Sequence, residues 1–190
     1  MDIIFYHGSN HKVDKLSDEY IGREKAIDQE GPGIYFTTSK EDAEMYGKYI
    51  YTVKLNPKKI LGKKKSTSVS KFDLIKLIKM KEDWKMNAQD WSENPEVGVR
   101  KAAESSIEYN DTDKDVFLQV WIDFYRYSGR EYVKNMAKLG YDGIFVPKEN
   151  GINHLVVYNP LIINIVNVED REIEEIRRII KETINEMVNR

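Results

Sequence analysis

The sequence predicts an α+β protein, because strand-like and helix-like patterns occupy separate parts of its 190 residues. Apolar and polar residues alternate in 49–55, as they do in a half-buried strand. Residues 70–138 instead repeat their apolar positions at helical spacing, and strand patterns return after them. We therefore expect one domain over 1–168 with a helical insert at about 70–138, followed by an amphipathic C-terminal helix in 169–190.

The first part of the domain is expected to hold three strands, in 2–6, 33–37 and 49–55. A short helix is expected between the last two strands. Ser39 has the side chain of a helix N-cap, and Asp42 follows three residues later in the position that completes a capping pair.

The last part of the domain is expected to form a hairpin-like pair of strands. The stretches "GYDGIFVP" and "HLVVYNPLIINIVNV" are joined by Lys148 to Gly151, which are turn-forming residues. The helix after them places isoleucines and a methionine on one face, which predicts packing on the body or contact with a partner. These residues are Ile173, Ile176, Ile180, Ile184 and Met187.

The absence of cysteine excludes disulfides, thiolate metal sites and cysteine nucleophiles. No pair among His7, His11 and His154 has metal-ligand spacing, so we expect no metal site. His11 lies in a polar loop, where a solvated role is expected. The chain also lacks a phosphate-binding loop and a dinucleotide-binding glycine fingerprint.

The charge balance does not indicate a general nucleic-acid binder, because 30 basic residues face 32 acidic ones and the net charge is −2. A run of lysines in 54–65 is interpreted as a solvated loop, with a polyanion contact as the alternative. No apolar stretch approaches the roughly 20 residues that cross a bilayer. The amino end carries an acidic residue and has no long apolar run. We expect a cytoplasmic protein without membrane contact.

Two short stretches place polar and aromatic groups at predicted strand ends. In "FYHGSN", His7 leaves a strand into Gly8 and Ser9, where glycine allows a ligand to approach the backbone. A capped turn is the alternative. In "GPGIYFTTSKEDAEMYG", Tyr35 lies on a strand and Tyr46 on the short helix eleven residues later. Two such rings suit a slot for a flat heteroaromatic ring, or both belong to the core.

These stretches together resemble the ADP-ribosyltransferase superfamily, in its diphtheria-toxin and poly(ADP-ribose) polymerase branch. That branch has a His-Gly-Ser/Thr strand, a Gly-x-Gly-hydrophobic-Tyr-Phe strand, and a second tyrosine eleven residues on. The residues His7 to Ser9, Gly31 to Phe36 and Tyr46 match this pattern with the same spacing. The stretch "IGREKAIDQEGPGIYFT" is similar to ADP-ribosyltransferase domains of phage polyvalent proteins. The resemblance covers residues 3–61 and 136–168.

The resemblance implies a split β-fold of two small antiparallel sheets with a NAD+ cleft between them. It implies that Tyr35 and Tyr46 sandwich the nicotinamide ring, that the backbone of Gly8 holds the carboxamide, and that His7 bonds the ribose side. The residues that it assigns to NAD+ binding are His7, Gly8, Ser9, Gly33, Tyr35, Phe36 and Tyr46.

The sequence differs from the family's pattern at the position of the catalytic glutamate, because His154 occupies that position in "NHLVVY". The catalytic candidates are His7, Tyr35, His154 and Glu149. In a first interpretation, the chain transfers one ADP-ribose with His154 or with an acid of the acceptor. In a second, Glu149 swings in from the preceding loop. In a third, the site binds NAD+ or another nucleotide without turnover.

The resemblance thus implies a NAD+-dependent mono-ADP-ribosyltransferase that acts on a macromolecular acceptor, with protein favoured over nucleic acid. A phage or bacterial role in host conflict fits by analogy. Two alternatives remain open at this stage. One is a non-catalytic module that keeps the fold and binds a nucleotide or a partner. The other is a related reaction, NAD+ glycohydrolysis or removal of an RNA 2'-phosphate.

Overall fold

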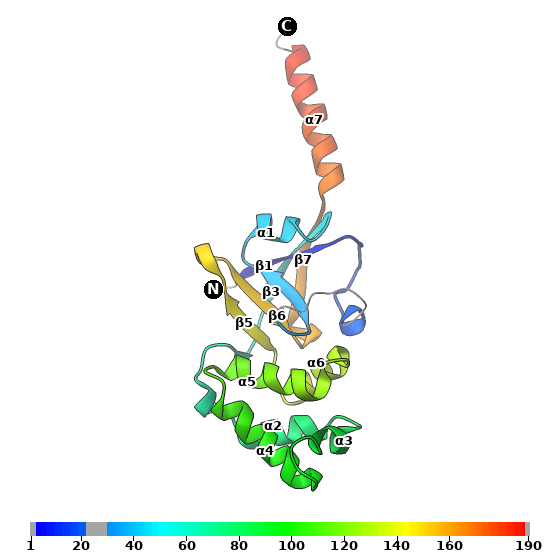
Figure 1. The fold of residues 1–190 in the computed structure, drawn as a ribbon. Helices are drawn as coiled ribbons and strands as arrows, with labels where there is room; N and C mark the ends of the chain where they lie inside the picture. The colour runs from blue at the N-terminus through cyan, green and yellow to red at the C-terminus, as the bar shows by residue number, and fades with distance from the viewer. Residues whose placement is uncertain (1–2, 22–29, 189–190) are drawn as a thin grey trace.

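The computed structural model describes residues 3–21 and 30–188 and shows strands at both ends of the domain with helices between them (Figure 1). The strands are β1 (Ile4–Ser9), β2 (Ile34–Thr37), β3 (Tyr49–Leu55), β4 (Ile60–Leu61), β5 (Gly143–Pro147), β6 (Asn153–Val157) and β7 (Ile163–Asp170). They form a sheet in the order β4-β5-β6-β2-β1-β3-β7. The predicted α+β class is confirmed.

The helices follow the expected distribution, with one between β2 and β3, a group in the insert and one after β7. They are α1 (Lys40–Glu44), α2 (Lys71–Lys79), α3 (Trp84–Ala88), α4 (Pro95–Glu108), α5 (Asp113–Val120), α6 (Gly129–Lys138) and α7 (Arg171–Val188). Short 3₁₀ turns cover Asp18–Tyr20, Ser66–Ser68, Glu149–Gly151 and Pro160–Ile162, and a π-helical segment, Trp121–Tyr125, follows α5. None of the helices in the described ranges is long and apolar enough to span a bilayer.

The sheet is nearly divided between β1 and β2, which share the single register pair Tyr6–Thr37. β1 pairs with β3 along its whole length, and β2 pairs with β6 along its own. The two separate antiparallel sheets that the resemblance implies are not confirmed. The Tyr6–Thr37 pair joins both halves into one sheet, and β4 runs parallel to β5.

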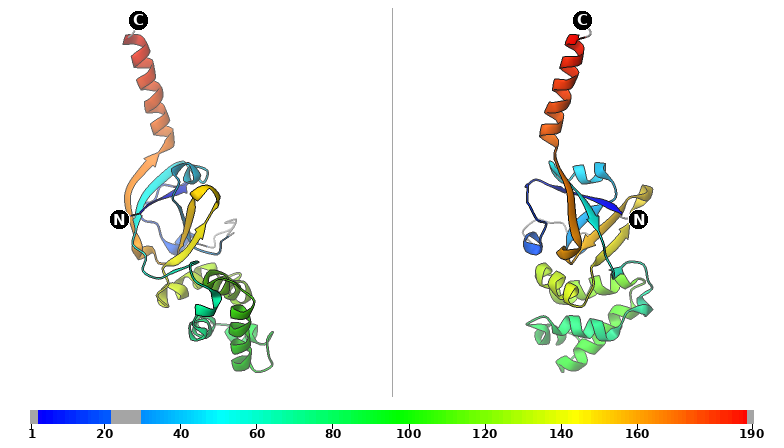
Figure 2. Two further views of the ribbon diagram at one scale, coloured as in Figure 1. Left: turned by 90° about the vertical axis from the view of Figure 1, so that its left-hand side faces the viewer. Right: turned by 180° about the vertical axis from the view of Figure 1, so that it is seen from behind.

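The helical insert packs against one end of the sheet, on the side away from α7 (Figures 1 and 2). Its interior is apolar and includes Val116, Phe117 and Val120 of α5, which are fully buried. Buried tyrosines there find acceptors on the backbone: the hydroxyl of Tyr125 donates to the carbonyl of Leu77 at 2.5 Å. Because the same buried cluster includes side chains of the sheet, the insert and the sheet share one core.

Candidate functional site

His7 lies within β1, directly after Tyr6, which forms the one register pair with β2. Its Nδ1 is 2.7 Å from the carbonyl oxygen of Tyr35 on β2, so the imidazole bridges the two strands beyond their one register pair. A carbonyl only accepts, so Nδ1 donates and Nε2 keeps its lone pair. Burial lowers the pKa of His7, against a smaller opposing effect of the Tyr35 hydrogen bond, and the ring is therefore neutral near pH 7.

Tyr35 is fixed by the turn that precedes β2. Its hydroxyl donates to the carbonyl of Gly31 at 2.6 Å and accepts from the backbone N–H of Glu30 at 3.3 Å. Gly31 has a φ of 89°, and a Cβ there would lie 2.4 Å from a methyl group of Leu118 in the insert. The turn thus packs against the helical insert, and this packing fixes the positions of both Tyr35 and Glu30.

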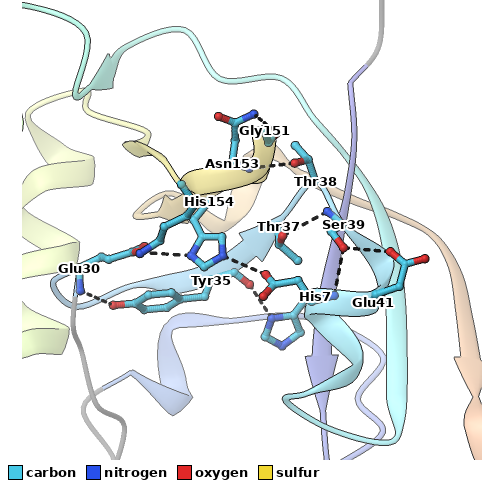
Figure 3. Close-up of polar contacts among 12 residues, drawn as sticks. His7, Glu30, Tyr35, Thr37, Thr38, Ser39, Glu41, Gly151, Asn153 and His154 are labelled. Atoms are coloured by element: carbon cyan, nitrogen blue, oxygen red, sulfur yellow. Dashed lines mark hydrogen bonds and ion pairs between the residues drawn. The ribbon is translucent and has the colours of Figure 1, made fainter.

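His154 lies on β6 directly opposite Thr37, on the same face of the sheet as Tyr35. Both of its ring nitrogens point at carboxylates, as Figure 3 shows. Nδ1 is 3.3 Å from Oε1 of Glu30, and Nε2 is 2.9 Å from Oδ2 of Asp42. The strand position at which the resemblance predicts the family's glutamate therefore presents an imidazole with a carboxylate on either side.

Glu30 is buried, with 8% of its surface exposed. Its Oε1 pairs with the ammonium of Lys148 and with His154, whereas Oε2 is buried and has no hydrogen-bond partner among the described residues. A buried carboxylate without full pairing is costly, and such groups are common at functional sites. We call His154, Asp42, Glu30 and Lys148 the His154 cluster. It joins two carboxylate side chains, one ammonium side chain and the imidazole.

α1 brings Asp42 to this cluster. Ser39 caps the helix by accepting the N–H of Asp42 at 3.1 Å, so the predicted capping residue is confirmed. Tyr46 was expected on this helix, but α1 ends at Glu44 and Tyr46 lies in the turn that follows, where it is 59% exposed. Burial raises the pKa of Tyr46, and the negative charges of Asp42 and Glu30 raise it further. The phenol of Tyr46 therefore lies within the electrostatic reach of the His154 cluster.

Two of the predicted glycines are required by close packing. A Cβ on Gly8 would lie 1.9 Å from the carbonyl oxygen of Ala43, so a glycine is what lets α1 pack on β1. A Cβ on Gly33 would lie 2.3 Å from a methyl group of Val156 on β6. Both glycines thereby bring chain segments close to the face that carries Tyr35 and His154.

The remaining predicted residues lie around this arrangement. Ser9 is engaged in a local turn with the backbone of His11, donating at 3.0 Å and accepting at 3.1 Å. Phe36 is buried in the core, with its ring centroid 5.5 Å from that of His7. Glu149 begins a 3₁₀ turn, and its side chain lies outside the described part of the chain.

The structure thus places Tyr35 and His154 on one face of the sheet and links His7 to Tyr35 through the Tyr35 carbonyl. Sequence reasoning missed Asp42, Glu30 and Lys148 as members of the site. A signal for Asp42 was present, because residues four apart share one face of a helix and Asp42 precedes Tyr46 by four. Glu30 and Lys148 reach the cluster through the fold alone. Within residues 3–21 and 30–188, no group of three candidate ligands is arranged for a metal ion.

A nearly divided sheet, a short capped helix and the His154 cluster are thus the features that surround the candidate site. The sequence model of a family described as "ADP-Ribosyltransferase in polyvalent proteins" matches residues 1–170, and the chain belongs to this family. The search of curated proteins gave no match. Among solved structures, the chain is similar to an anti-CRISPR protein at 16% identity. That likeness has a TM-score of 0.36 and covers 83% of this chain and 90% of the other.

Proposed function

We propose that this chain binds NAD+ and transfers its ADP-ribose group to a macromolecular acceptor. The observation that carries the proposal is the His154 cluster, in which two carboxylates lie beside the imidazole that replaces the family's glutamate. The family's reaction needs negative charge at that place, because positive charge develops on the ribose as nicotinamide leaves. Asp42 and Glu30 supply this charge from α1 and from the turn before β2.

The assignment of roles follows from these positions. Tyr35 and the exposed ring of Tyr46 hold the nicotinamide ring, while His7 fixes the Tyr35 backbone and keeps Nε2 as an acceptor for a hydroxyl. The bond between C1' of the ribose and the nicotinamide nitrogen breaks, and nicotinamide leaves with the electron pair. A nucleophilic atom of the acceptor then bonds to C1', and the His154–Asp42 pair takes the proton that this atom loses.

A protein acceptor is favoured over a nucleic acid. Asp42 and Glu30 lie in the site itself, and Glu41 and Glu44 lie on the same short helix. These carboxylates repel a phosphate backbone, whose binding depends on basic side chains. A protein side chain carries no such penalty.

The test is release of nicotinamide from NAD+ by the purified chain, with and without a cell lysate as a source of acceptors. Release that requires the lysate, together with incorporation of labelled ADP-ribose into protease-sensitive material, is the expected result. Release by the chain alone indicates NAD+ hydrolysis. Binding of NAD+ by calorimetry without any release would leave a non-catalytic binding module and refute the transferase.

A further inference from the structure

The C-terminal helix α7 carries an apolar face that the described residues of its own chain leave uncovered. The helix projects away from the body (Figure 2), and its described side chains are exposed. Its polar contacts with the body come from the first turn, where Arg171 bonds the backbone carbonyls of Lys48 and Glu44. The residues of the uncovered face are Ile173, Ile176, Ile179, Ile180, Ile184 and Met187.

Such a face needs an occupant, because most of the stability of a helix in a protein comes from packing of its apolar face, and α7 has 18 residues with little packing on the body. A lipid surface is a poor occupant. Residues 171–188 contain four basic and five acidic side chains and no aromatic one. Helices that lie on membranes instead have Lys and Arg on the polar face and Trp or Phe on the apolar face.

The charges that flank the face fit a second copy of the same helix. With Ile173 and Ile180 at heptad positions a and Ile176 at d, Glu172 lies at g and Arg177 lies at the following e. In a parallel pair, each g side chain meets the e side chain five residues later on the other helix. Glu172 of each copy then meets Arg177 of the other. An antiparallel pair places Arg177 beside a second Arg177 or beside Ile184, without an opposite charge.

The contacts that these two side chains make within one chain are easily exchanged. Oε2 of Glu172 lies 3.2 Å from Nζ of Lys48, and a guanidinium nitrogen of Arg177 lies 2.7 Å from Oε1 of Glu174. Glu172, Arg177 and Glu174 are largely exposed, and Lys48 is partly exposed. Exposed ion pairs of this kind contribute little to stability. Breaking these ion pairs to form Glu172–Arg177 pairs between two copies therefore costs little free energy. Burial of the apolar face of α7 away from water is favourable.

We propose that two copies of this chain associate through α7, with the two helices parallel and their isoleucine faces in contact. The a and d residues then meet their own counterparts, Ile176 against Ile176 and Met187 against Met187, while Ile179 at g meets Ile184 at e of the other copy. The two bodies lie at the same end of the helix pair, so both His154 clusters belong to one particle. This association is independent of the proposed reaction.

Sedimentation of the full chain from micromolar to submillimolar concentration tests the association. The expected particle has twice the 22.3 kDa mass of the chain at the upper end of the range. Ile176→Glu is expected to give a monomer throughout, because it places a charge in the apolar contact. Asn185→Glu adds the same charge on the opposite face and is expected to leave the dimer intact. A wild-type monomer at all concentrations, or a particle heavier than a dimer, overturns the proposal.

The orientation is tested separately. The chain contains no cysteine, so Met187→Cys introduces a single thiol. Oxidation is expected to link two chains through residue 187, which only the parallel arrangement allows. Glu172→Arg is expected to weaken association by about fivefold, and adding Arg177→Glu is expected to restore it. Failure of both the cross-link and the restoration, or sedimentation of the chain with phosphatidylcholine–phosphatidylglycerol vesicles, overturns the parallel dimer.

Discussion

Replacement of Asp42 by Asn isolates the charge that the proposed reaction needs. Asn keeps an oxygen that can accept from Nε2 of His154, 2.9 Å away, but removes the negative charge. A positive charge that develops about 6 Å from this carboxylate would interact with it by about 3 kcal/mol at an effective dielectric constant of about 20. We therefore expect Asp42→Asn to slow nicotinamide release about 100-fold, with NAD+ binding retained.

Glu41→Gln is the matched control for this substitution. Glu41 is the neighbouring carboxylate of α1, lies in the same first turn and is exposed. Both variants lose a favourable charge at the helix N-terminus, so their melting temperatures should fall by similar small amounts. Rates of nicotinamide release that are equal in the two variants would refute the assignment of the charge to Asp42.

Three further changes test the geometry around the site. Tyr35→Ala should abolish NAD+ binding measured by calorimetry while His11→Ala should not, and equal effects would argue against the tyrosine-lined site. Because burial lowers the pKa of His7 below its ordinary value of 6.5, its neutral form stabilises the fold above that pH, and this contribution is lost as the pH falls below it. His7→Asn should flatten the acid side of a plot of melting temperature against pH, and an unchanged plot would contradict a neutral His7. Gly8→Ala forces a methyl group against the carbonyl of Ala43, 1.9 Å away, and should destabilise the chain by about 1–3 kcal/mol in chemical denaturation; no loss of stability would show that α1 shifts freely.

Local patterns in the sequence predicted the elements that depend on neighbouring residues. The alternation in "YIYTVKL" predicted a strand over 49–55, and β3 spans the same residues. Ser39 predicted the start of α1 because its capping bond reaches only three residues along the chain. The expected strand end at His7 was wrong, because β1 continues through Gly8 and Ser9, which pair with Ile50 and Tyr49 of β3.

The composition of the His154 cluster could not be predicted in this way. Asp42 lies 112 residues before His154, and Glu30 lies 124 residues before it. Their meeting depends on the pairing of β2 with β6 and on the packing of α1 on β1, which no local pattern specifies. The connection of both sheet halves through the one Tyr6–Thr37 pair was missed for the same reason, since strand patterns do not reveal which strands become neighbours.

The contact of Leu118 with Gly31 has a consequence for how this domain can be dissected. The turn that carries Glu30 and orients Tyr35 packs against Leu118 of α5. Pro32, in the same turn, packs against Gly129 at the start of α6. A shortened domain that kept the strands and α1 but omitted the insert would lose the support of this turn. Transplanting the strand motifs alone into another scaffold would therefore carry over the residues of the site without the geometry that joins them.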